Sequence, residues 1–142
     1  MSATTTTIRH RVLIVDDEES TRLLLAKILS HDLKVEVVLA GTCEQALKLA
    51  GNYAYDAILL DLMMPGIGGV EVLKQLRASS PNIATPVMIV SVLSDKKTID
   101  LCMSLGANAY LVKPVERHSL VNTVKAQIAS RKKPKPQKKK DD

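Results

Sequence analysis

The segment AILLDLMMPG, residues 57–66, decides the fold. It begins with an apolar run of the length of a strand, and Pro65-Gly66 then forces a turn. Asp61 is therefore expected at the carboxyl end of a strand that is buried on both faces, as strands in parallel sheets are. A carboxylate in this place needs a metal ion, a lysine or an arginine nearby, because it would otherwise be protonated. Ligands bind at this edge of parallel sheets, so the segment predicts a site around Asp61.

The rest of the chain alternates short apolar runs with helical patterns. The other apolar runs are residues 11–15, 35–40, 87–90 and 109–112, and the helical patterns are residues 20–31, 42–49, 70–76, 95–105 and 117–130. Thr42 and Gln45 form a capping box and Gly106 is a natural helix end, whereas no good N-cap precedes the last helix. The alternation predicts an α/β fold, a doubly wound five-stranded parallel sheet with helices on both faces. The composition leaves the strand order open.

Length and charge divide the chain into one domain and two polar ends. Its 142 residues suit a single domain, and the core must be aliphatic because the chain has no Phe or Trp. We expect a disordered arm at residues 1–9, the domain at 10–130 and a basic disordered tail at 131–142. The net charge of +5 lies in that tail, since the positive and negative residues before it balance.

The basic tail predicts at most a weak contact with a polyanion. Nucleic acid, an anionic membrane surface and an acidic protein are all open as partners, and a solubilising end or a linker is an equal alternative. About a dozen residues cannot form a DNA-reading module, so we expect no sequence-specific DNA binding.

Two further features favour a cytoplasmic protein. The start of the chain lacks the apolar run of a secretory signal, and no stretch approaches the roughly 18 apolar residues of a membrane span, so the protein is not expected to be integral to a membrane. Cys43 and Cys102 are far apart in the sequence and have no metal-binding neighbours, which predicts two buried thiols in a reducing compartment.

Four of the apolar runs end in a residue with useful chemistry. Asp16-Asp17 follows the first run, Asp61 the third, Ser91 the fourth and Lys113 the fifth. Any one of them alone would be interpreted as a solvated loop residue. Because the carboxyl ends of parallel strands meet at one edge, the residues are expected to converge. Three carboxylates, a hydroxyl and an ammonium group suit a divalent cation together with a phosphoryl group.

These residues resemble the response-regulator receiver domain, the phosphoacceptor module of two-component signalling. The resemblance rests on VDD at residues 15–17, LDLMMPG at 60–66, Ser91 and YLVKP at 110–114, and it covers about residues 9–130. The spacing also fits, with 30 residues from Asp61 to Ser91 and 22 from Ser91 to Lys113. The resemblance implies the flavodoxin-like strand order 2-1-3-4-5, which is a property of the family.

The resemblance also implies the roles of the acidic residues. Asp61 would accept a phosphoryl group from a histidine kinase, a phosphotransfer protein or a small acyl phosphate. Asp17, Asp61 and the main-chain carbonyl of Met63 would bind Mg²⁺ directly, and Asp16 would hold the ion through water. Mg²⁺ prefers such hard oxygen ligands and keeps several waters. The domain would catalyse only its own phosphorylation and dephosphorylation, and it would not be an enzyme acting on other substrates.

The remaining residues are implied to stabilise and report the phosphoryl group. Lys113 would pair with Asp61 at rest and with the phosphoryl oxygens afterwards, and Ser91 would donate its hydroxyl to those oxygens. Tyr110 corresponds to the aromatic switch residue of the family, and Lys113-Pro114 to its cis peptide bond. A downstream protein would bind the face formed by the fourth helix, fifth strand and fifth helix, which includes Lys97, Asp100, Tyr110 and Lys125.

The resemblance also bears on the lifetime of the phosphoryl group, through two positions that are apolar in this chain. In the family, the second residue after the phosphoacceptor and the second after the hydroxyl tune this lifetime, and here they are Met63 and Leu93. Neither can orient a hydrolytic water. We therefore expect slow self-dephosphorylation.

Three alternatives accompany this interpretation. The chain could be the receiver part of a larger regulator or hybrid kinase. A phosphatase with an aspartyl-phosphate intermediate would usually have an acid two residues after Asp61, where this chain has Met63. A flavin-binding electron carrier shares the architecture, but acids follow the first strand where a phosphate cradle of Ser, Thr and Gly would be expected.

Overall fold

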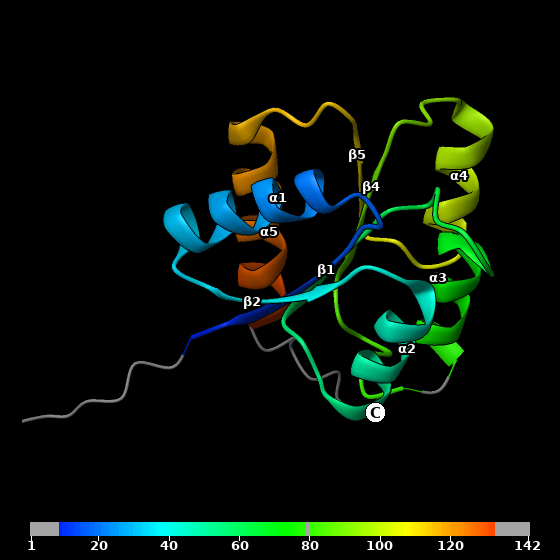
Figure 1. Cartoon of the computed structure of the whole chain (residues 1–142), viewed down its shortest axis with the longest axis horizontal. Helices are drawn as coiled ribbons and strands as arrows, with labels where there is room; N and C mark the ends of the chain where they lie inside the picture. Colours follow the sequence, from blue (N-terminus) through cyan, green and yellow to red (C-terminus); the bar gives the residue numbers. More distant parts are fainter. Residues whose placement is uncertain (1–8, 79, 133–142) are drawn as a thin grey trace, which may run out of the picture.

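The computed structural model describes residues 9–78 and 80–132, which form a five-stranded parallel sheet between two layers of helices (Figure 1). The strand order is β2-β1-β3-β4-β5, so the predicted fold and the order implied by the resemblance are confirmed. The strands are β1 (Arg11–Val15), β2 (Glu36–Ala40), β3 (Ala57–Leu60), β4 (Val87–Ser91) and β5 (Ala109–Val112). The helices are α1 (Glu19–Leu33), α2 (Cys43–Asn52), α3 (Gly68–Ala78), α4 (Lys96–Ser104) and α5 (Arg117–Lys132).

The sheet separates two aliphatic cores. In β3 and β4 every residue is buried, which explains why these strands are continuous apolar runs without alternation. Helices α1 and α5 cover one face through residues such as Leu29 and Leu120. Helices α2, α3 and α4 cover the other face, where Leu73 and Cys102 are buried (Figure 1). Cys43 is buried too, so both cysteines are the buried free thiols that the sequence predicted.

Side-chain caps set most of the helix starts. The Thr42 hydroxyl accepts from the Gln45 N–H at 3.0 Å, as predicted, while the Gln45 side chain bonds the N–H of Gly41 and not that of Thr42. The start of α5, for which the sequence offered no good cap, is held by Glu116. Its carboxylate accepts hydrogen bonds from the main-chain N–H groups of His118 and Ser119. Because these bonds favour the charged form, they lower the pKa of Glu116.

Several boundaries differ from the sequence prediction by a few residues. Helix α5 continues through Lys132, two residues past the predicted end at Ser130, and Arg131 pairs with Asp56 at 3.0 Å. The rest of the predicted tail, residues 133–142, and residues 1–8 of the predicted arm lie outside the described residues.

In the part of the chain that the structure describes, no helix combines the length and the apolar character needed to cross a membrane.

Helix α1 carries apolar residues on two sides. Leu25 and Leu29 are buried in the core, but Leu24, part of the same predicted pattern, is 57% exposed. With Ile28 and the side chain of Arg117, Leu24 lines a surface hollow between α1 and the start of α5. The helix therefore presents an apolar strip, Leu24 and Ile28, beside Lys27 and His31, which line the same hollow.

A polar cross-link ties the loops at the amino-terminal edge of the sheet. The Arg77 guanidinium, at the end of α3, donates to the carbonyl of Gly106 between α4 and β5, and to the carbonyls of Asn82 and Ile83 before β4. Asn82 is fully buried and its amide donates to the carbonyls of Ala50 and Tyr53. This network fixes the end of the sheet opposite to Asp61.

Candidate functional site

The register of the sheet places Asp16 and Asp61 side by side. Val15 of β1 pairs with Leu60 of β3, so the next residue of each strand is an aspartate. The ladder continues past the strand ends, because the Asp61 N–H donates to the Val15 carbonyl at 3.0 Å. Two segments that are 45 residues apart in sequence thus deliver carboxylates to one place.

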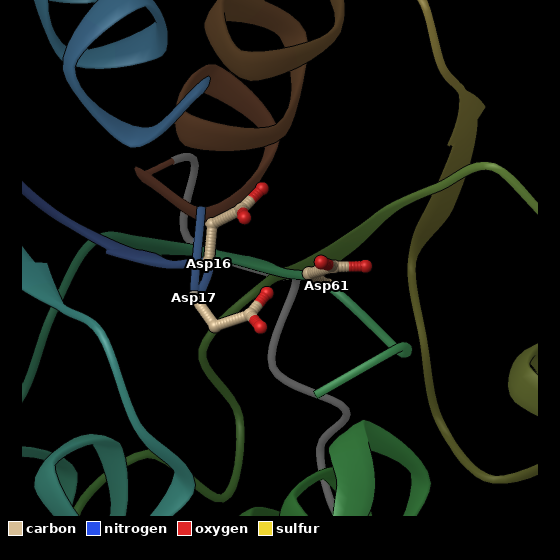
Figure 2. A group of neighbouring side chains, drawn as sticks. All are labelled: Asp16, Asp17 and Asp61. Atoms are coloured by element: carbon tan, nitrogen blue, oxygen red, sulfur yellow. The ribbon is translucent and has the colours of Figure 1, made fainter. Parts of the chain in front are cut away.

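Three carboxylates gather at this edge of the sheet. Figure 2 shows the side chains of Asp16 and Asp17, from the end of β1, beside that of Asp61, from the end of β3. One oxygen of each lies within 4.8 Å of the others. Asp16 and Asp61 are 1% and 5% exposed, whereas Asp17 is exposed. The group therefore offers hard oxygen ligands with one side open to solvent, which fits a Mg²⁺ ion.

Lys113 is the cation of the site. Its Nζ lies 2.9 Å from Asp16 Oδ2 and 3.4 Å from Asp61 Oδ2, so its shorter ion pair is with Asp16. Burial alone would lower the pKa of Lys113, but the hydrogen bond to Asp16 and the charges of Asp61 and Asp16 raise it overall. The peptide bond to Pro114 is cis, in agreement with the resemblance.

Lys113 compensates the negative charge of the buried Asp61 carboxylate only in part. Burial raises the pKa of Asp61 and the charge of Asp16 raises it further, against the lowering effects of the Met63 N–H, 3.1 Å from Asp61 Oδ1, and of Lys113. A bound divalent cation would add the missing positive charge. The protonation state of Asp61 is thus coupled to whatever cation the site holds.

A hollow of about 450 Å³ opens over Asp61. Its polar wall consists of Asp17, Glu18, Asp61 and Lys113, and its outer wall includes Met63 and Val92. Met63 and Val92 are 53% and 58% exposed. The opening therefore combines a charged floor with an apolar rim, and it is large enough to admit a phosphoryl group.

Ser91 and Tyr110 are connected through Leu93. The buried Ser91 accepts the Leu93 N–H at its Oγ, at 3.1 Å, and the Tyr110 hydroxyl donates to the Leu93 carbonyl at 2.6 Å. Burial raises the pKa of Tyr110, so its hydroxyl stays protonated and able to donate near neutral pH. A displacement of Ser91 would therefore reach Tyr110 through Leu93, which is hydrogen-bonded to both residues.

Most of the predicted residues converge, with two departures. Asp16, Asp17, Asp61 and Lys113 meet directly, and Ser91 and Met63 occupy the adjoining strand end and loop. Lys113, expected to pair with Asp61, lies closer to Asp16. Lys125 does not join Lys97 and Asp100, because it lines a hollow with Leu33 and Val35 on the side of α5 that faces α1 and β2.

The chain is similar to known proteins over most of its length. The model of the response regulator receiver domain matches residues 12–125. The sensory/regulatory protein RpfC of Xanthomonas campestris is 36% identical over 116 residues, which are 80% of this chain and 16% of RpfC. The chain spans about half or less of the length of the curated relatives that it matches.

Solved receiver structures have the same fold. The receiver domain of the Francisella response regulator 1452 superposes with a TM-score of 0.81 at 29% identity, over 87% of this chain and all of that one. The receiver domain of the sensor histidine kinase PA1611 from Pseudomonas aeruginosa, with magnesium coordinated in its active site cleft, gives a TM-score of 0.78 at 25% identity, over 86% and 99% of the two chains.

Proposed function

The chain belongs to the response regulator receiver family of two-component signalling, and on that premise we propose that it is a phosphorylation switch whose acceptor is Asp61. The donor is the phosphohistidine of a kinase or phosphotransfer protein, or a small acyl phosphate. The observation that carries this proposal is the meeting of three carboxylates and the Lys113 ammonium group under an open hollow. The cytoplasm, where such donors are made, is the proposed location.

The carboxylates are the proposed Mg²⁺ site. Asp17, Asp61 and the Met63 carbonyl are the direct ligands, and Asp16, whose oxygens already bond the Glu18 N–H and Lys113, acts through water. The magnesium complex named for the PA1611 receiver supports the same choice here. When bound, the ion supplies the charge neutralisation that phosphoryl transfer requires.

Transfer needs an ionised Asp61 aligned with the donor. An Asp61 carboxylate oxygen forms the new bond to phosphorus while the bond from phosphorus to the histidine nitrogen, or to the acyl oxygen, breaks. The leaving group departs with that electron pair. Lys113 then moves its hydrogen bonds toward the phosphoryl oxygens. Ser91 joins it, because its Oγ accepts from Leu93 and its own proton remains to be donated.

The output step uses the chain from Ser91 to Tyr110. A phosphoryl group that draws Ser91 inward also moves Leu93, whose carbonyl holds the Tyr110 hydroxyl. The proposed partner surface is the face of α4, β5 and α5, with exposed Lys97 and Asp100 beside the half-buried Tyr110. A partner that prefers the shifted Tyr110 would bind the phosphorylated form more tightly.

A phosphodonor has a second surface available. The apolar strip of α1 begins at the exposed Leu24, in the second turn of the helix, and this helix starts two residues after Asp17. A helix of the donor packed on Leu24 would bring its phosphohistidine close to the hollow over Asp61. We therefore assign the strip to the donor and the α4-β5-α5 face to the downstream partner.

The first experiment is incubation with acetyl phosphate and Mg²⁺, followed by mass spectrometry of the intact chain. We expect one phosphate per molecule, absent from Asp61→Asn and absent when EDTA is added. Continuous release of phosphate over many turnovers would favour the phosphatase alternative, and no modification of the wild-type chain would refute the proposal. Because the relatives are longer, the same experiment applies if this chain is the receiver part of a larger regulator or hybrid kinase.

A further inference from the structure

Arg22 lies in the first part of α1 and was not among the residues predicted from the sequence. Its Nη1 donates to the main-chain carbonyl of Asp16 at 2.7 Å, and its side chain is half-buried. This carbonyl belongs to the peptide that joins Asp16 to Asp17. We propose that Arg22 is a positioning residue for the cation site, because it fixes the peptide plane from which the Asp17 carboxylate projects. The inference rests on the proposed function.

Asp17 depends on its backbone more than the other two carboxylates do. Asp16 is held at both oxygens, by the Glu18 N–H at 2.9 Å and by Lys113 at 2.9 Å. Asp61 accepts from Met63 and Lys113. Within residues 9–78 and 80–132, by contrast, no protein group hydrogen-bonds the Asp17 carboxylate. Its direction is therefore set by the peptide that Arg22 holds, and by its own rotamer.

Gly41 provides the space in which the guanidinium lies. A Cβ at this position would be 3.0 Å from Arg22 Nη1 and 3.4 Å from Cζ, so the guanidinium packs directly on the glycine. The φ angle of Gly41 is not in the positive region that favours glycine, which leaves this close contact as the structural reason for a residue without a side chain. The turn is held from its other side, because the Gly41 N–H donates to Gln45 of α2.

Arg22 thus joins three segments around one peptide. It belongs to α1, bonds the residue after β1, and rests on the turn between β2 and α2. A charged donor to a carbonyl is among the stronger hydrogen bonds, and a guanidinium confined on one side loses less freedom in making it. The acidic loop after β1 is consequently preset before any cation arrives.

The electrostatic and the positioning effects of Arg22 have opposite signs. Its positive charge, close to the acidic group, disfavours a second cation, so removing the charge alone would tighten Mg²⁺ binding. Removing the hydrogen bond would loosen the Asp16-Asp17 peptide and weaken binding. Loss of residues that orient metal ligands typically lowers metal affinity by about 10–100-fold, so the positioning effect should dominate. The direction of the change therefore discriminates between the two roles.

The test is the Mg²⁺ affinity of the full chain, measured by calorimetric titration without any phosphodonor. We expect Arg22→Met to bind Mg²⁺ about tenfold more weakly than the wild type. Gly41→Ala should weaken binding about two- to fivefold, because it keeps every ligand and every charge and only displaces the guanidinium. Gly51→Ala is the matched control, since a Cβ there meets no atom within 4 Å. Its affinity should equal that of the wild type.

A second measurement needs no metal. Loss of the bond to the Asp16 carbonyl should shift the amide ¹⁵N resonance of Asp17 in the Mg²⁺-free spectrum of both variants, while the urea midpoint shows that they remain folded. Arg22→Met binding Mg²⁺ as tightly as the wild type, or more tightly, would overturn the inference, and if that variant does not fold, Gly41→Ala decides by the same criterion. A wild-type chain that binds no Mg²⁺ would instead refute the proposed function.

Discussion

The contact between α3 and the backbone of the phosphoacceptor gives the sharpest prediction. Gly69, near the start of α3, is buried against the loop after β3, and a Cβ there would lie 2.4 Å from the Asp61 carbonyl oxygen and 2.6 Å from Leu62 Cα. Both neighbours are main-chain atoms, which cannot rotate away. The substitution Gly69→Ala must therefore move the backbone that carries Asp61.

The expected cost follows from two opposing effects. Alanine is better than glycine inside a helix by about 0.5–1 kcal/mol. Forcing a methyl group into filled space costs about 1–3 kcal/mol, and contacts this short with backbone belong to the upper end. We expect a net loss of about 2 kcal/mol in the free energy of unfolding, which for a chain of this size lowers the melting temperature by roughly 6–10 °C.

Two assays separate stability from function in this variant. Urea unfolding, followed by circular dichroism because the chain has no Trp, gives the free energy, and the rate of phosphorylation by acetyl phosphate under conditions where the variant is folded reports the placement of Asp61. Both the rate of phosphorylation and the free energy of unfolding should be lower in Gly69→Ala than in the wild type. Gly51→Ala, which creates no close contact, should be as stable as the wild type or slightly more stable. A Gly69→Ala protein with wild-type stability and rate would refute the reasoning.

Three further predictions concern the site and its support. In Mg²⁺-free buffer at pH 7, Asp61→Asn should be more stable than the wild type, because burial raises the pKa of Asp61 and so penalises its charged form. The gain should vanish as the pH falls and Asp61 becomes protonated, and equal urea midpoints at pH 7 would contradict it. Arg77→Ala should lose about 2–4 kcal/mol of stability, since it strips hydrogen bonds from three carbonyls. Arg77→Lys should restore only part, and full recovery in urea unfolding would count against the role of the guanidinium fork. Met63→Asn, which places an amide able to orient water at the mouth of the hollow, should speed loss of the phosphoryl group about tenfold, measured with Mg²⁺ and no phosphatase. An unchanged lifetime would mean that Met63 is not responsible for slow dephosphorylation.

The parts of the structure that depend on local pattern were predictable. Apolar runs that end on Asp16, Asp61 and Ser91 mark strands of a parallel sheet, and the common direction of those strands brings their ends together. Thr42 precedes a helix in the way that a cap does, and its side chain accepts a main-chain N–H there. In each case the residues that form the sequence pattern are also the residues that make the interaction in the structure.

Contacts that depend on three-dimensional register were not predictable. The preference of Lys113 for Asp16 over Asp61 arises from sub-ångström placement of three side chains, which no spacing encodes. Arg22 resembles any charged residue on a helix surface until the turn at Gly41 is seen beneath it. The exposure of Leu24 depends on the absence of a covering element, and Asn82 lies in a stretch whose composition indicates only a loop.

The cross-link made by Arg77 limits how the domain can respond. It anchors Gly106, directly beyond the last turn of α4, to the end of α3, whereas the opposite end of α4 follows the loop that bears Val92 and Leu93. A helix that is held at one end can tilt about that end but cannot move along its own axis. Any displacement transmitted from Asp61 to α4 should therefore be a tilt about a pivot at Gly106, with the largest excursion at Lys96 and Lys97.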